Sequence, residues 1–150
     1  MTSETKTILL VSGPALDQLG ERDPKLYGTD TLEDIENYVR EKASELSVEV
    51  KCFQSDSEER IIEFLDEHRD EADGVIINPA ALTHYSVGLA ACLETFDCPC
   101  VEVHITNLYR REKYRHESIT GSSCVGVIMG FGMRGYGFAV DYILESLKKT

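Results

Sequence analysis

An arginine and a tyrosine stand five residues apart in the first long polar stretch of the sequence, residues 9–28, which reads LLVSGPALDQLGERDPKLYG. After its apolar start the stretch is rich in Pro, Gly and charged residues, so we expect a loop rather than core. A phenol is protonated at neutral pH, but a nearby guanidinium favours its phenolate. If the loop folds back, Arg22 and Tyr27 form a candidate general base with its activating charge.

A second candidate acid–base group is the sequence EVH, residues 102–104. Glu102 and His104 are two positions apart on a predicted strand, so their side chains point to the same side of the sheet. A histidine held by a carboxylate can protonate a leaving hydroxyl group. The pair is also compatible with a structural role at the end of a strand, or with a metal site.

Two arginines follow in LYRREKYRHES, residues 108–118. Arg111 and Arg115 are four positions apart, a spacing that predicts one face of a helix. Guanidinium groups on such a face are suited to binding hydroxyls or a carboxylate. The alternative is a solvent-exposed run of charge. Together with Tyr27 and His104, the pattern predicts that one group abstracts a proton while another protonates a leaving group.

The hydrophobic pattern predicts the elements that must position these residues. Short apolar or alternating runs predict strands, and amphipathic runs between them predict helices. Strands are expected at 7–11, 48–53, 74–78, 100–105 and 122–130, and helices at 31–46, 57–72, 84–96 and 136–149. Thr31 opens the first helix in a capping-box pattern with Asp34.

Strands separated by helices predict βαβ units, and hence a parallel sheet covered by helices on both faces. Five strands in 150 residues fit one α/β domain, residues 1–150, with a flavodoxin-like sheet of order 2-1-3-4-5. Such sheets bind ligands beyond the carboxyl ends of their strands, where the strand order reverses. The loop from Ser12 should therefore face the loop from Asn78, beside the end of the fourth strand. This site collects Arg22, Tyr27, Asn78, His84, Glu102 and His104.

Composition limits the classes of partner. The net charge of −12 argues against nucleic-acid binding, which needs clustered Lys and Arg, but not against an anionic small molecule held by a few arginines. No apolar run approaches the roughly 18 residues of a membrane span, and residues 7–11 are too short for the apolar part of a signal peptide. The five cysteines are odd in number, which favours free thiols in a reducing cytoplasm.

Other uses of this fold are not supported by the motifs. GFGMRG, residues 130–135, matches GxGxxG but has no acidic residue on a following strand, so we interpret its glycines as tight strand-to-helix packing. CPC, residues 98–100, has no second cysteine pair nearby and is interpreted as the entry to a strand rather than a metal or redox site. Ser12 and Asn78 stand where a phosphoacceptor receiver domain has acidic residues, and SGPALDQLG lacks the turn of a flavin-phosphate site.

Five segments carry a family resemblance, and they occur in a single order along nearly the whole chain. They are ILLVSGPALDQLGERDPKLYG, CFQSDSEERIIEFL, GVIINPAALTHYSVGL, VEVHITNLYRREKYRHES and GVIMGFGMRGYGFAVDYIL. In this combination the chain resembles the type II 3-dehydroquinate dehydratases. The resemblance implies a flavodoxin-like fold, assembly into trimers or a dodecamer, and cofactor-free dehydration of 3-dehydroquinate to 3-dehydroshikimate. The reaction that it implies is an anti elimination through an enolate.

The resemblance also implies roles for individual residues. Tyr27 would be the base and Arg22 its activator, both on a mobile lid at about residues 18–28, while His104, oriented by Glu102, would protonate the departing C1 hydroxyl. The substrate-binding groups that it implies are Asn78, His84, Arg111, Arg115 and the backbone N–H groups of Ile105 and Thr106. It implies a small-molecule substrate, no metal and no cofactor.

The sequence departs from the family pattern at several positions. The family loop usually reads Asn-Gly-Pro-Asn, and here Ser12 and Ala15 replace the two amides, the second of which helps to hold a water at the enolate. Asp56 replaces an Asn and Ala80 a usual Gly. Ala90-Ala91 replaces an Arg-Asp pair whose Asp normally reaches a neighbouring subunit's site.

These departures leave three functional interpretations open. Loss of a direct oxyanion donor costs about 3–4 kcal/mol and loss of a water-mediated one less, so a weakened dehydratase is predicted unless Asp17, Gln18 or a relocated water substitutes for the amide. A paralogue that dehydrates a different hydroxylated cyclic carboxylate is the second interpretation. The third is a non-catalytic, ligand-binding oligomer.

Overall fold

Five parallel strands form one sheet in the order β2-β1-β3-β4-β5. The computed structural model describes residues 5–149, and the outermost residues of the predicted 1–150 domain lie outside this range. The strands are β1 (Thr7–Ser12), β2 (Glu49–Gln54), β3 (Gly74–Asn78), β4 (Cys100–His104) and β5 (Gly126–Met129). The predicted flavodoxin-like topology is confirmed.

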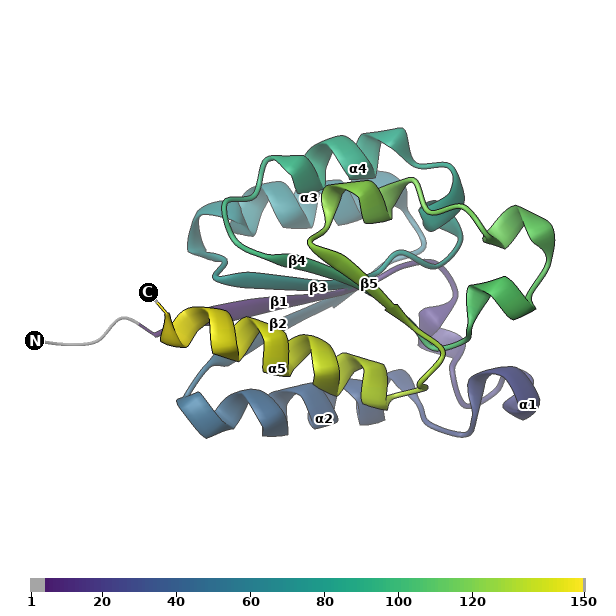
Figure 1. Cartoon of the computed structure of the whole chain (residues 1–150), viewed down its shortest axis with the longest axis horizontal. Helices are drawn as coiled ribbons and strands as arrows, with labels where there is room; N and C mark the ends of the chain where they lie inside the picture. The colour runs from purple at the N-terminus through teal and green to yellow at the C-terminus, as the bar shows by residue number, and fades with distance from the viewer. Residues whose placement is uncertain (1–4, 150) are drawn as a thin grey trace, which may run out of the picture.

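Helices cover both faces of this sheet (Figure 1). They are α1 (Pro24–Tyr27), α2 (Leu32–Ala43), α3 (Glu58–His68), α4 (Val87–Glu94) and α5 (Arg134–Lys148), and short 3₁₀ turns join several elements. Figure 1 shows α3 and α4 on one face and α2 and α5 on the other, with the small helix α1 at one end of the sheet.

The period of two along β1 explains the two-sided core. Ile8 and Leu10 belong to the apolar cluster that includes buried residues of α2 and α5, whereas Leu9 and Val11 belong to the cluster built with α3 and α4. All four side chains are fully buried. A strand that is apolar on both faces can only be stable inside such a three-layer arrangement.

Side-chain caps decide where two of the helices begin. The predicted capping box is present at α2, because the Thr31 hydroxyl accepts from the Asp34 N–H and the Asp34 carboxylate accepts from the Thr31 N–H. The predicted start of a helix at residue 84 is wrong, since the Ser86 hydroxyl accepts from the Leu89 N–H and α4 begins at Val87. His84 instead ends the preceding 3₁₀ turn.

The fifth strand is shorter than the predicted 122–130. Thr120–Ser123 form a 3₁₀ turn, and the Ser118 hydroxyl accepts from the Gly121 N–H. These local hydrogen bonds compete with strand geometry, so β5 begins at Gly126.

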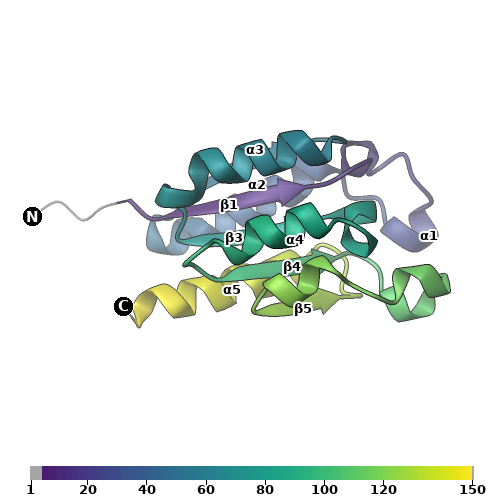
Figure 2. The same cartoon turned by 90° about the horizontal axis from the view of Figure 1, so that it is seen from above.

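All five strands point the same way, so their carboxyl ends lie at one end of the molecule (Figure 2). The same end carries α1 and the loop that follows β4 (Figure 2). Within residues 5–149, no helix combines the length and apolar character that crossing a membrane would need.

Candidate active site

A cavity of about 180 Å³ lies where the strand order reverses, at the ends of β1, β3 and β4. Gly13, directly after β1, lets the two facing loops meet, because a Cβ there would lie only 2.4 Å from the Pro79 carbonyl oxygen. The Gly13 N–H donates to the Asn78 carbonyl oxygen at 2.8 Å, which fixes the contact between these loops. The topological prediction that the loop from Ser12 faces the loop from Asn78 is confirmed.

The charge of this pocket is opposite to that of the whole chain. Its lining side chains include Arg22, Arg111, Arg115, His84 and His104, together with Tyr27, Asn78, Ile105 and Thr106. None of the described residues that line it is Asp or Glu, although the net charge of the chain is −12. The pocket therefore suits an anionic small molecule.

The lid brings its arginine and tyrosine into direct contact. The Arg22 Nη2 donates to the Tyr27 hydroxyl oxygen at 3.1 Å, and the guanidinium lies 4.1 Å from the ring centre. Arg111, distant in the sequence, donates from Nη2 to the same oxygen at 3.3 Å. The Tyr27 hydroxyl oxygen thus accepts from two guanidinium groups, one before it in the sequence and one after it, and both are cationic.

The local sequence explains how the lid presents Tyr27. Asp23 caps α1 by accepting from the Lys25 N–H, Pro24 stands at the first helical position, and Gly28 leaves the helix with φ +70°. This single turn places Arg22 before the helix and Tyr27 at its end, so that both side chains line the same cavity. The predicted loop at 18–28 therefore contains a short helix.

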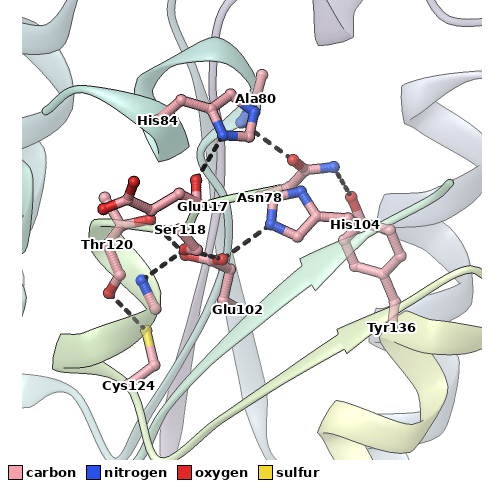
Figure 3. A network of polar contacts seen from close by, with 11 residues as sticks. Asn78, Ala80, His84, Glu102, His104, Glu117, Ser118, Thr120, Cys124 and Tyr136 are labelled. Carbon is pink, nitrogen blue, oxygen red and sulfur yellow. Dashed lines mark hydrogen bonds and ion pairs between the residues drawn. The ribbon is translucent and has the colours of Figure 1, made fainter. Parts of the chain in front are cut away.

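Glu102 and His104 form a buried ion pair at the end of β4 (Figure 3). The His104 Nε2 lies 2.8 Å from the Glu102 Oε2, and the two side chains are 6% and 0% exposed. The hydroxyls of Ser118 and Thr120 also donate to this carboxylate. Burial alone would raise the pKa of Glu102, but the hydrogen bonds and the charge of His104 together lower it below its usual range. Glu102 is thus held as an anion beside the His104 ring.

Tyr136 of α5 holds the side-chain amide of Asn78 in one orientation (Figure 3). Its Nδ2 donates to the Tyr136 hydroxyl oxygen at 3.0 Å, and its Oδ1 accepts from the Ala80 N–H at 3.1 Å. Tyr136 is fully buried, which raises the pKa of its phenol to about 12. The phenol therefore stays neutral, and the amide of Asn78 is held in one orientation with one N–H and one oxygen lone pair committed.

His84 and the two arginines complete the lining. The His84 Nδ1 lies 2.8 Å from the Glu117 carbonyl oxygen. Arg111 donates to the Thr106 hydroxyl at 3.1 Å, and Arg115 donates to the Glu112 carboxylate at 3.2 Å. All three side chains line the same pocket.

The prediction that Arg111 and Arg115 share one helical face is wrong. Asn107 caps the 3₁₀ turn Leu108–Arg110, and Arg111 follows it with extended backbone before a second turn, Lys113–Arg115. Both arginines line the pocket, but the extended backbone at Arg111 breaks the helical spacing between it and the turn that carries Arg115.

Ala15 has a methyl group at the rim of the pocket and an unusual backbone. Its φ is +67°, the left-handed region that Asn and Gly adopt more easily than Ala. Its N–H donates to the Asp56 carboxylate at 2.9 Å, so the two departures from the family pattern contact each other. Asp17 and Gln18, proposed as substitutes for the missing amide, do not line the pocket.

The glycines and cysteines that the sequence analysis set aside lie outside this pocket. Gly135 is in the first turn of α5, and a Cβ there would lie 3.3 Å from Val103 of β4 and 3.4 Å from Ile128 of β5, which fits the strand-to-helix packing interpretation of GFGMRG. Cys100 opens β4 as a buried residue, and all five cysteines are free. Among residues 5–149, no three His, Cys, Asp or Glu side chains gather as a metal site would require.

The sequence reasoning missed the residues that support the site from behind. Ser118 and Thr120 contact Glu102 across 16 and 18 positions, and Tyr136 contacts Asn78 across 58. The sequence offered one weak signal for Tyr136: it is a polar aromatic residue at the start of a predicted helix whose other core positions are apolar. No local spacing connects these residues to their partners.

Comparison with known proteins decides the family. The model of the family described as "Dehydroquinase class II" matches residues 6–144. The chain belongs to this family. A 3-dehydroquinate dehydratase of Bacillus mycoides (strain KBAB4) is 42% identical over 145 residues, which cover 97% of this chain and 99% of that protein.

Solved structures of the type II dehydroquinase family share the fold. The type II dehydroquinase from Propionibacterium acnes superposes with a TM-score of 0.89 at 38% identity, covering 96% of this chain and 99% of the other. A 3-dehydroquinate dehydratase-like protein from Bifidobacterium longum is similar at a TM-score of 0.72 and 27% identity, with the same coverage. The likeness extends over nearly the full length of each chain.

Proposed function

We propose that this member of the type II dehydroquinase family is a hydro-lyase that converts 3-dehydroquinate to 3-dehydroshikimate and water. One observation carries the proposal: a phenolic oxygen with two arginine donors and a histidine paired with a buried carboxylate line the same cationic pocket. A base and an acid are what a β-elimination of water requires. The 3-dehydroquinate dehydratases at 42% identity support this assignment.

In the first step, Tyr27 removes a proton from the carbon between the ketone and the carbon that carries the leaving hydroxyl. The electron pair of the broken C–H bond moves into the ketone, which becomes an enolate. Arg22 and Arg111 stabilise the phenolate that accepts the proton, since both donate to its oxygen.

In the second step, the enolate collapses and the C1–oxygen bond breaks. His104 donates its proton to the departing hydroxyl, which leaves as water, and Glu102 stabilises the imidazolium beforehand. Tyr27 loses its proton and His104 regains one before the next cycle, so the reaction consumes no co-reactant. Both proton carriers are side chains, and the proposal needs no cofactor.

The remaining lining residues bind the substrate in this proposal. Asn78 and His84 contact its hydroxyls, and Arg111 and Arg115 attract its carboxylate. The backbone N–H groups of Ile105 and Thr106, directly after β4, hold the same carboxylate. The cationic lining supports this distribution of roles.

A second candidate is dehydration of a different hydroxylated cyclic carboxylate. It is favoured by the methyl group of Ala15, which lines the pocket where the family pattern has an amide. Ala90-Ala91 supports the same interpretation, because the acidic side chain that normally reaches a neighbouring subunit is missing. The pocket chemistry would be unchanged, and only the recognised hydroxyls would differ.

We also propose that the chain forms a homo-oligomer, a trimer or a dodecamer of trimers, in the cytoplasm. Exposed apolar side chains beside β5 and on α5 support association, because Val125 and Phe131, which flank β5, and Phe138 and Tyr142, which lie on α5, are each about half exposed or more. The free cysteines fit a reducing compartment. Light scattering after size-exclusion chromatography measures the assembly directly.

The test of the proposed activity is the ultraviolet absorbance of the conjugated enone formed from purified 3-dehydroquinate. Steady formation of the enone at catalytic enzyme concentration supports the dehydratase. Absence of turnover at high enzyme concentration refutes it. Binding of 3-dehydroquinate without turnover, measured by calorimetry, would favour the ligand-binding interpretation, and turnover of a related hydroxylated cyclic carboxylate alone would favour the paralogue.

A further inference from the structure

One short segment contacts the machinery around both histidines of the pocket. We call residues 117–120 the strap. The Glu117 carbonyl oxygen lies 2.8 Å from the His84 Nδ1, and the Ser118 and Thr120 hydroxyls both donate to the Glu102 carboxylate that holds His104 (Figure 3). The Ile119 N–H donates to the Thr83 carbonyl oxygen at 2.8 Å, which ties the strap to the turn that carries His84.

We propose that Ser118 and Thr120 are positioning residues of the elimination, which hold Glu102 as a fixed anion and thereby set the pH range in which His104 can donate its proton. The inference rests on the proposed function, because it concerns the acid of that reaction.

The hydrogen bonds at Glu102 carry the argument. Oε2 accepts from His104 at 2.8 Å and from Ser118 at 2.7 Å, and Thr120 is the donor that reaches Oε1. Glu102 and Thr120 are both 0% exposed, so bulk water cannot replace a lost hydroxyl without structural change. An ionised carboxylate is an acceptor only, and both hydroxyls therefore stabilise its charged form.

The two hydroxyls act on His104 indirectly, through the charge of the Glu102 carboxylate that all three groups contact. They stabilise Glu102 most when His104 is neutral and the carboxylate is a bare anion. When His104 is protonated, the ion pair already neutralises much of that charge. Loss of a hydroxyl should therefore raise the pH at which the pair releases its proton, and move the alkaline limb of the pH–rate profile upward.

The strap fixes which ring atom His84 presents, and Glu102 does the same for His104. A carbonyl oxygen only accepts, so the His84 Nδ1 carries the hydrogen that Glu117 receives, and Nε2 is the ring nitrogen left for a substrate hydroxyl. His104 uses Nε2 toward Glu102 and presents Nδ1. The ring nitrogen left free for a ligand is therefore Nε2 in His84 and Nδ1 in His104.

Other titratable groups surround the pair and enter its pH response. Those that line the same pocket are Arg22, Tyr27, His84, Arg111 and Arg115. On the other side of Glu102 lies the Cys124 thiol, whose pKa burial raises to about 12. This thiol stays neutral over the working pH range, and Thr120→Val, Ser118→Ala and the other strap variants leave all six groups in place.

Thr120→Val and Ser118→Ala test the proposal in pH profiles of kcat and kcat/KM with 3-dehydroquinate. Each variant should lower kcat about tenfold and move the alkaline limb up by roughly half a pH unit. Thr120→Ser keeps the hydroxyl and should restore both values. Ser123→Ala is the matched control, because it removes a hydroxyl of the same turn that donates to the Ala90 carbonyl oxygen instead. A uniform loss of kcat with an unmoved limb would mean a structural role only, and would overturn the proposal.

Nitrogen-15 NMR of the histidines separates this inference from the proposed function. Titration of the unmodified chain and of Thr120→Val needs no turnover, and His84→Gln and His104→Gln assign the signals. If the pH midpoint of the His104 signals is higher in Thr120→Val than in the unmodified chain, the proposed role of the strap is supported even when 3-dehydroquinate is not turned over. If the unmodified chain turns over 3-dehydroquinate but the pH midpoint of His104 is the same in Thr120→Val, the positioning role of the strap is refuted and the proposed dehydratase activity is not.

Discussion

The two halves of the pocket are built in opposite ways. The lid half consists of Arg22 and Tyr27, which are the only residues at positions 21–30 that are not exposed, and α1 has no buried residue. The strand-end half consists of Asn78, Glu102 and His104, which are 4%, 0% and 5% exposed. The proposed base, Tyr27, therefore lies on a loosely packed loop, and the proposed acid, His104, lies on the rigid sheet.

This difference separates activity from stability. Exposed hydrogen bonds contribute little to the free energy of unfolding, whereas breaking a buried pair leaves a charge that cannot be solvated. A lid that packs weakly can also open to admit substrate, and a buried acid keeps its geometry while it does so. We expect lid variants to lose activity alone, and strand-end variants to lose both.

Tyr27→Phe should have the largest effect on activity. Removing the base should lower kcat by about 10³-fold or more, while the melting temperature stays close to that of the unmodified chain. Tyr142→Phe, an exposed tyrosine on α5, is the matched control and should keep full activity. Full activity in Tyr27→Phe would refute the mechanism, and a large loss of stability would contradict the description of the lid half.

Glu102→Gln should affect both quantities. We expect kcat to fall about 100-fold and the free energy of unfolding at neutral pH to fall by about 3 kcal/mol. The folded-state pKa of Glu102 is lowered, so the carboxylate stabilises the fold fully above its unfolded value, near 4.5, and this contribution is lost as the pH falls through the lowered value.

Denaturant unfolding at neutral and acid pH checks the sign of this prediction. The stability difference between the unmodified chain and Glu102→Gln should be greatest near neutrality and should shrink below about pH 4.5. A difference that stays constant down to acid pH would mean that Glu102 is not held as an anion in the fold.

Ala15→Asn should have the smallest effect and the opposite sign. Ala15 lies between the two halves, at φ +67°, and its N–H contacts Asp56. An amide should raise kcat by about three- to tenfold if it restores a water-mediated donor, and the better backbone fit should add about 0.5–1 kcal/mol of stability. Ala15→Gly relieves the backbone without an amide and should not raise kcat. Equal kcat in Asn and Gly variants would show that the site is built around another donor or substrate.

The fold and the contents of the pocket could be predicted largely from the sequence. The buried strands and the Thr31 cap follow from short-range patterns, the strand order follows from the flavodoxin-like fold that alternating strands and helices fit, and the carboxyl ends of parallel strands lie at one edge of the sheet. Local competition caused the errors. The Ser86 hydroxyl caps α4 later than the apolar pattern had suggested. The Asn107 side chain caps a 3₁₀ turn that ends at Arg110, so no helix spans the two arginines at 111 and 115.

The sequence by itself determined which side chains stand at the ends of β1, β3 and β4, because residue type and strand period are local properties. Only the tertiary structure decided what each of them contacts. Arg111 contacts Tyr27 across 84 positions, and Ser118 of the strap contacts Glu102 across 16 positions, a separation that no helix or strand period predicts. Such contacts depend on how distant segments pack, and packing is a property of the whole fold rather than of any spacing along the chain.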